Sequence, residues 1–152
     1  MAWLFKTEPT ECSIDDIAAA SSGVIWEGVR NYQARNFLRD QVQLGDLVLI
    51  HHSSCAEIGL AGVARISKTA FADPSQFQPD SIYYDAKASS ERWPWYAVQV
   101  EFVEKFQKII TLSELRKYEA LADMVLLRKG NRLSVMPVTK QQMELVLFLT
   151  KA

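Results

Sequence analysis

The apolar segments of this sequence are short, and polar residues or turn signals soon interrupt each of them. Residues 1–5 and 47–50 are continuous apolar runs of the kind found in buried strands. Residues 96–102 alternate apolar and polar side chains, which predicts a further strand. Residues 59–66 predict another strand, in which two glycines indicate a close approach of backbone. Together these segments predict a sheet of several short strands, and the run at residues 1–5 is too short for a signal peptide or a membrane span.

Side chains that cap helices mark helix starts between these strands. The signals are Ser13 with Asp16, Asn31 opening a helix to about Asp40, Thr111 with Glu114, and Thr139 with Gln142. A final strand is expected over residues 132–138, and residues 71–93 are expected to form a long loop. Long crossover helices are too few for a doubly wound sheet. The pattern predicts a mixed α/β (α+β) fold, with a curved sheet or small barrel flanked by short helices.

Length and charge limit the classes of protein that fit. The chain has 152 residues, which predicts a single domain over residues 1–152. Its formal net charge is −1, which excludes a non-specific nucleic-acid coating protein but leaves room for a local basic patch. The two cysteines, Cys12 and Cys55, form no CxxC pair, so we expect reduced thiols in the cytoplasm, or in the nucleus of a eukaryote. We expect a monomer that does not bind membranes.

Several blocks of sequence, spread over nearly the whole chain, resemble the EVE family of PUA-like domains. The blocks are Trp3-Leu4-Phe5-Lys6-Thr7-Glu8-Pro9, residues 26–36 from Trp26 to Asn36, Gly45-Asp46, His52-Ser53, Gly59 with Gly62, Tyr83-Tyr84-Asp85, Trp93, and residues 132–138 from Arg132 to Val138. The chain is similar, more weakly, to YTH domains, which hold a methylated base of RNA in an aromatic cage. The resemblance implies a PUA-like fold and a module that reads a modified base in DNA or RNA.

The resemblance to YTH domains implies that Trp26 forms one wall of an aromatic cage. A base stacked on such a face gains about 1–3 kcal/mol. Trp26 could instead fill the core. Further cage walls are expected from Tyr84 and Trp93 in the long loop. The residues expected to form hydrogen bonds with the polar edges of the base are Lys6, Glu8, Asn31, Ser53 and Ser134. An ion pair between Lys6 and Glu8 and a helix cap at Asn31 are the structural alternatives.

Basic residues near this predicted pocket form two clusters that could contact phosphates. The phosphate-contacting candidates are Arg30, Arg35, Arg128 and Arg132. Solvated helix faces and surface ion pairs explain the same residues equally well.

The neighbouring His51, His52 and Cys55 invite an enzymatic interpretation, but consecutive residues of a strand point to opposite faces. We therefore expect no catalytic residues, no metal site and no cofactor. The leading hypothesis is a non-catalytic reader of a base flipped into an aromatic pocket. The alternatives are a PUA-type RNA-binding adaptor without modification specificity, and an enzyme acting on a small nucleoside-like ligand.

Overall fold

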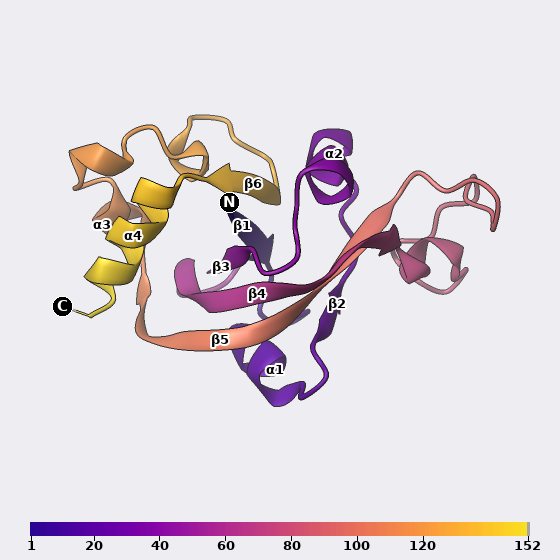
Figure 1. Ribbon diagram of the computed structural model, residues 1–152, viewed down its shortest axis with the longest axis horizontal. Coiled ribbons are helices and arrows are strands. Elements are labelled where there is room, and N and C mark those ends of the chain that lie inside the picture. Colours follow the sequence, from indigo (N-terminus) through magenta and orange to yellow (C-terminus); the bar gives the residue numbers. More distant parts are fainter. Residues whose placement is uncertain (152) are drawn as a thin grey trace.

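A computed structural model describes residues 1–151. Its strands form one mixed, strongly curved sheet in the order β2-β5-β4-β3-β1-β6 (Figure 1). The strands are β1 (Ala2–Thr7), β2 (Val24–Trp26), β3 (Leu47–His52), β4 (Gly59–Ala72), β5 (Tyr96–Ile110) and β6 (Val135–Val138). Neighbouring strands are antiparallel except β1 and β3, which run parallel. The predicted mixed α/β fold is confirmed, as a curved open sheet rather than a closed barrel.

Three short α-helices and three 3-10 turns connect the strands, and a fourth helix follows the last strand within residues 1–151. They are α1 (Ile14–Ala19), α2 (Tyr32–Asp40), α3 (Leu112–Leu115), α4 (Lys140–Leu149), η1 (Pro74–Phe77), η2 (Glu119–Leu121) and η3 (Val125–Leu127). The predicted caps are present: Ser13 and Thr139 head full capping boxes, and Asn31 Oδ1 accepts from the Ala34 N–H at 3.0 Å. No helix among residues 1–151 is long and apolar enough to span a bilayer.

The sheet is buried on both faces, which explains why its central strands are continuous apolar runs. Along β1, Trp3 and Phe5 enter a core cluster with residues of α1 and α2, whereas Leu4 enters a second cluster with residues of α3 and α4. Figure 1 shows α3 and α4 at one end of the curved sheet, and the segment between β4 and β5 projecting from the other. Because successive side chains of β1 point to opposite faces of the sheet, this one strand contributes to both cores.

Register shifts between β4 and β5 produce the curvature. The pairing slips at several points between Leu60 and Phe71, as expected where bulges bend a sheet. Gly62 permits the close approach of the two strands, since a Cβ there would clash with the backbone carbonyl oxygen of Glu104 in β5 and would lie 2.7 Å from Cγ1 of Ile14 in α1. Pairing with β5 also carries β4 on to Ala72, so the expected loop over residues 71–93 begins two residues later and contains η1. The last strand begins at Val135 rather than at residue 132.

His51 is an unusual buried group of this sheet. It is 2% exposed, and neither ring nitrogen has a hydrogen-bond partner among the described residues. Burial, followed by the positive charges of Lys6 and His52, lowers the pKa of His51 from 6.5 to about 4. The folded protein therefore favours the neutral imidazole.

We expect the free energy of unfolding to fall as the pH is lowered from 6.5 to about 4. The unfolded chain takes up a proton on His51 in this range, whereas the folded chain does not, so the loss from this group reaches about 3 kcal/mol. His51→Leu removes the group, and urea unfolding at pH 7, 5.5 and 4 measures the effect. The free energy of unfolding of the variant, relative to that of the wild type, should increase as the pH falls. A constant difference between the two proteins would contradict this role of His51.

Candidate functional site

A pocket of about 720 Å³ opens where the carboxyl ends of β1 and β3 meet β2 and the segment before β6. Its lining combines two basic and four acidic residues with aromatic and aliphatic side chains. The lining residues are Lys6, Thr7, Glu8, Glu11, Cys12, Asp16, residues 24–29, Ser53, Ile82, Tyr83 and residues 132–134. A volume of this size lies within the range of small-molecule sites. Of the predicted site residues, it brings together Trp26, Lys6, Glu8, Ser53, Ser134 and Arg132.

Backbone pairing at the end of β1 explains how three of these residues meet. β1 and β3 run parallel, so their carboxyl ends lie at the same edge of the sheet. The Ser53 N–H donates to the Thr7 carbonyl at 2.9 Å, and the Lys6 N–H donates to the Ser134 carbonyl at 2.8 Å. The chain around Lys6 is thus held from both sides, which brings the two serines to the same pocket wall as Lys6.

Trp26 belongs to both the core and the pocket. It is 5% exposed, and its ring centroid lies 5.4 Å from that of Phe5 at an interplanar angle of 42°. It ends β2, the edge strand that pairs with β5, and it also lines the pocket. Trp26 therefore fills the core, one of the two roles that the sequence left open for it, and it presents only a small surface to the pocket.

The aromatic residue that the long segment contributes to the pocket is Tyr83. Its hydroxyl donates a short hydrogen bond to Glu11, and its ring lies against Gly28. A Cβ on Gly28 would lie 2.6 Å from Cε2 of Tyr83, and Gly28 has φ +85°, so glycine is needed there for both space and conformation. Gly28, two residues after Trp26, therefore admits a second aromatic ring to the site.

A buried ion pair holds this part of the pocket in place. Asp73 is 0% exposed and accepts from Arg30 Nη1 at 2.9 Å, the Gly28 N–H at 2.8 Å and the Ser75 N–H at 2.8 Å. Burial raises the pKa of Asp73, but the hydrogen bonds from Ser75, Arg30 and Gly28 outweigh it and lower that pKa below its usual range. Arg30 also donates through Nη2 to the Tyr83 carbonyl at 2.7 Å. Asp73 and Arg30, which we term the Asp73–Arg30 clasp, thus tie Gly28 and Tyr83 together.

The donors of Arg30 are used inside the protein. Its guanidinium donates to the carbonyls of Val29 and Tyr83, to Asp73 and to the Ser75 hydroxyl, and it lies 5.2 Å from the ring centroid of Trp95. This arrangement favours positioning of the pocket over the phosphate contact expected from the sequence. Arg35 is also engaged, since its Nη1 donates to the Pro94 carbonyl at 2.6 Å.

The pocket keeps its thiol and phenol protonated at neutral pH. Burial, then the nearby charges of Asp16 and Glu11, raises the pKa of Cys12 to about 11. Burial and the hydrogen bond to Glu11 raise the pKa of Tyr83 to about 12. Cys12 therefore lacks the low pKa of a nucleophilic cysteine.

Burial shifts the pKa of two charged residues of the pocket. Burial lowers the pKa of Lys6. Burial, and then repulsion from Asp73, raises the pKa of Glu27, with a smaller contribution from Glu11. With more acidic than basic side chains, the interior suits a neutral or cationic group that donates hydrogen bonds better than it suits a phosphate.

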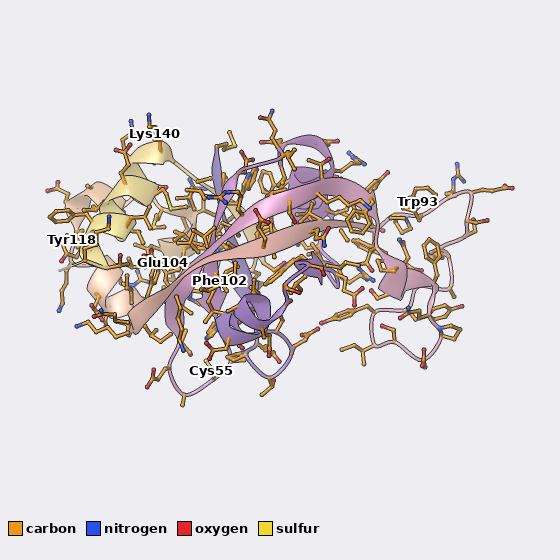
Figure 2. All side chains as sticks on the ribbon, turned by 60° about the horizontal axis from the view of Figure 1, so that its bottom comes forward. Cys55, Trp93, Phe102, Glu104, Tyr118 and Lys140 are labelled. Atoms are coloured by element: carbon orange, nitrogen blue, oxygen red, sulfur yellow. The ribbon has the colours of Figure 1, made fainter. Side chains whose placement is uncertain are left out.

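Several predicted site residues lie outside the pocket lining. Asn31 caps α2 through Oδ1, and Tyr84 is exposed next to Tyr83. Trp93 lies on the projecting segment (Figure 2), where its indole N–H is buried and makes no hydrogen bond with any described residue. Arg35 and Arg128 are likewise absent from the lining.

The sequence singled out Tyr84 rather than Tyr83 and did not single out Glu11, Cys12 or Glu27. A loop has no periodicity that tells which of two adjacent tyrosines faces inward. Glu11 precedes α1 and is recognisable only through its contact with Tyr83 across 72 positions. The Tyr83-Tyr84-Asp85 block and the position of Glu27 beside Trp26 were the only available signals.

The two histidines lie on β3 and do not converge with a nucleophile. His52 Nε2 accepts from the Ile14 N–H at 3.1 Å, and His51 is buried beside Lys6. Among residues 1–151, no three or more His, Cys, Asp and Glu side chains are grouped so that they could hold a metal ion.

Comparison with known families assigns the chain to one of them. Residues 1–149 match the EVE domain family. The chain belongs to the EVE family. Thymocyte nuclear protein 1 of Homo sapiens is 37% identical over 165 residues, which cover 97% of this chain and 72% of that protein.

Solved structures of similar proteins have the same fold. A protein from Pseudomonas syringae is 47% identical with a TM-score of 0.94, and each chain is covered to 99%. Human THYN1, in complex with 5-methylcytosine-containing DNA, is 36% identical with a TM-score of 0.91 and covers 99% of this chain and 98% of that chain. A member of the family therefore binds DNA that carries a modified base.

Proposed function

We propose that this protein is a non-catalytic module that binds nucleic acid by taking a modified base into the pocket beside Trp26. The observation that carries this proposal is the pocket itself, which joins an aromatic surface to polar groups at the end of β1. Its volume accommodates a nucleobase, and the 5-methylcytosine DNA complex of human THYN1 supports a base as the ligand class.

The charge of the pocket assigns roles to its residues in this proposal. Glu8 and Glu27 accept hydrogen bonds from amino groups of the base, and Lys6 and Ser134 donate to its carbonyl oxygens. Arg132 is exposed at the lining and contacts a phosphate next to the flipped nucleotide. Arg30 and Asp73 hold the wall in shape and do not touch the ligand.

Binding measurements on matched oligonucleotides test the proposal. Fluorescence anisotropy with single-stranded and duplex DNA and RNA, with and without 5-methylcytosine, should show tighter binding of modified oligonucleotides. Equal affinity for modified and plain RNA would instead support the PUA-type RNA-binding adaptor. Equal affinity for every oligonucleotide would contradict the proposed base specificity.

The affinity should depend only moderately on salt. The chain has a net charge of −1 and one arginine at the pocket, so we expect about two to four phosphate contacts. The slope of log affinity against log salt measures this number. A slope that corresponds to about eight or more released counterions would contradict a compact pocket and indicate an extended groove.

The position of Glu27 in the pocket lining, together with a pKa that burial and Asp73 raise, favours a second candidate, an enzyme that acts on a nucleoside-like ligand. A carboxyl group with a raised pKa in a pocket is suited to general acid catalysis. Mass spectrometry of modified oligonucleotides and nucleosides after incubation tests this function, with Glu27→Gln as the control. Turnover by the wild type that is lost in the variant would support the enzyme, and unchanged ligands would support the non-catalytic module.

A further inference from the structure

The rim of the pocket carries an apolar side chain that the binding of a base does not explain. Ile82 is 86% exposed, the highest exposure among the large hydrophobic residues described, and it lines the pocket next to Tyr83. Ile25, the middle residue of β2, lines the same pocket and is also exposed. Isolated exposed isoleucines are common on protein surfaces. Because Ile82 lies on the rim of the site, its exposed side chain would face a nucleic acid bound there.

The backbone on both sides of Ile82 is fixed, although its side chain is in solvent. The Tyr83 N–H donates to Ser81 Oγ at 3.1 Å, and the Tyr84 N–H donates to the Ser81 carbonyl at 3.1 Å, which closes a turn around Ile82. Arg30 holds the Tyr83 carbonyl, and the Tyr83 hydroxyl is bonded to Glu11. Ile82 is therefore the outward residue of a turn that is anchored to the pocket wall.

A rigid apolar side chain beside a base pocket has a defined use in duplex DNA. A flipped base leaves a gap in the stack, and apolar side chains such as isoleucine occupy such gaps or wedge between base steps. An ordered turn presents the side chain with little loss of conformational entropy on binding.

We propose that Ile82 is a wedge that enters the duplex and fills the space left by the base taken into the pocket. This inference rests on the proposed function, which it extends to double-stranded substrates. It makes Ile82 a residue that contacts neighbouring bases of the duplex rather than the base in the pocket. The wedge stabilises the flipped state only where a stack has to be opened.

Ile82→Ala tests the wedge without endangering the fold, because the side chain is almost fully exposed. The probe is a DNA duplex with one 5-methylcytosine, compared with the same strand alone and with a duplex that has an abasic site opposite the modified base. Ile58→Ala is the matched control, since Ile58 is an exposed isoleucine outside the pocket lining. A 2-aminopurine beside the modified base reports unstacking by its fluorescence.

We expect Ile82→Ala to weaken binding of the paired duplex by about tenfold and to lower the 2-aminopurine signal. Binding of the single strand should weaken much less than binding of the paired duplex, and the abasic site should remove most of the deficit. Equal binding of the paired duplex by wild type and variant would overturn the wedge, as would an equal loss on the single strand. If wild-type protein shows no preference for the modified single strand, the proposed function fails first, independently of Ile82, and the wedge fails with it.

Discussion

Asp73→Ala is expected to lower the free energy of unfolding by about 3–5 kcal/mol, the range for removing one partner of a buried ion pair. Asp73 is fully buried, and the variant would leave Arg30 and the N–H groups of Gly28 and Ser75 without their acceptor. Each lost acceptor costs further free energy when the donor stays buried. Urea unfolding measures the loss.

The same change should weaken ligand binding by more than the unfolded fraction explains, because Gly28 and Tyr83 lose their link. Asp80→Ala is the matched control, since Asp80 is an exposed aspartate of the same projecting segment. We expect its stability to stay within about 0.5 kcal/mol of the wild type. A loss below about 1 kcal/mol in Asp73→Ala would contradict the role of the Asp73–Arg30 clasp.

Trp26→Ala is expected to cost a similar amount, about 3–5 kcal/mol, because Trp26 is 5% exposed and packs against Phe5. This variant alone does not separate the core role of Trp26 from its pocket role. Trp26→Phe does, because a smaller ring leaves a smaller cavity while it keeps an aromatic surface. We expect Trp26→Phe to fold and to lose part of its preference for the modified base.

Trp3→Phe is the control for Trp26→Phe. Trp3 is fully buried in the same core cluster but is absent from the pocket lining. Thermal unfolding and a binding assay on both variants give the comparison. Both should be destabilised, and only Trp26→Phe should change selectivity. Unchanged selectivity in Trp26→Phe would remove Trp26 from the ligand site.

The sheet and its caps were predictable from local patterns, because caps and apolar periodicity act over a few residues. Ser13, Asn31 and Thr139 begin their helices as expected. The edge strand β2 was not expected, since three residues are too few to show a periodicity. The lengths of β4 and β5 depend on pairing between distant residues, which no local pattern contains.

Part of the pocket was predictable for the same reason. Lys6, Ser53 and Ser134 lie at strand ends, so a sheet prediction brings them together. Tyr83 and Glu11 meet only because the Asp73–Arg30 clasp folds the projecting segment back onto the sheet. Arg30 shows most clearly what the sequence lacks. Nothing in the sequence around an arginine tells whether its side chain is free at the surface or hydrogen-bonded inside the protein, as Arg30 is.

A crystal structure of this protein with a 5-methylcytosine oligonucleotide tests the central proposal most directly. We expect the modified base to lie in the pocket next to Trp26 and Tyr83, with Lys6 and Ser134 within hydrogen-bond distance of its polar edge. A modified base that stays stacked in the nucleic acid, with the pocket empty and the contacts elsewhere on the surface, would contradict the proposed site.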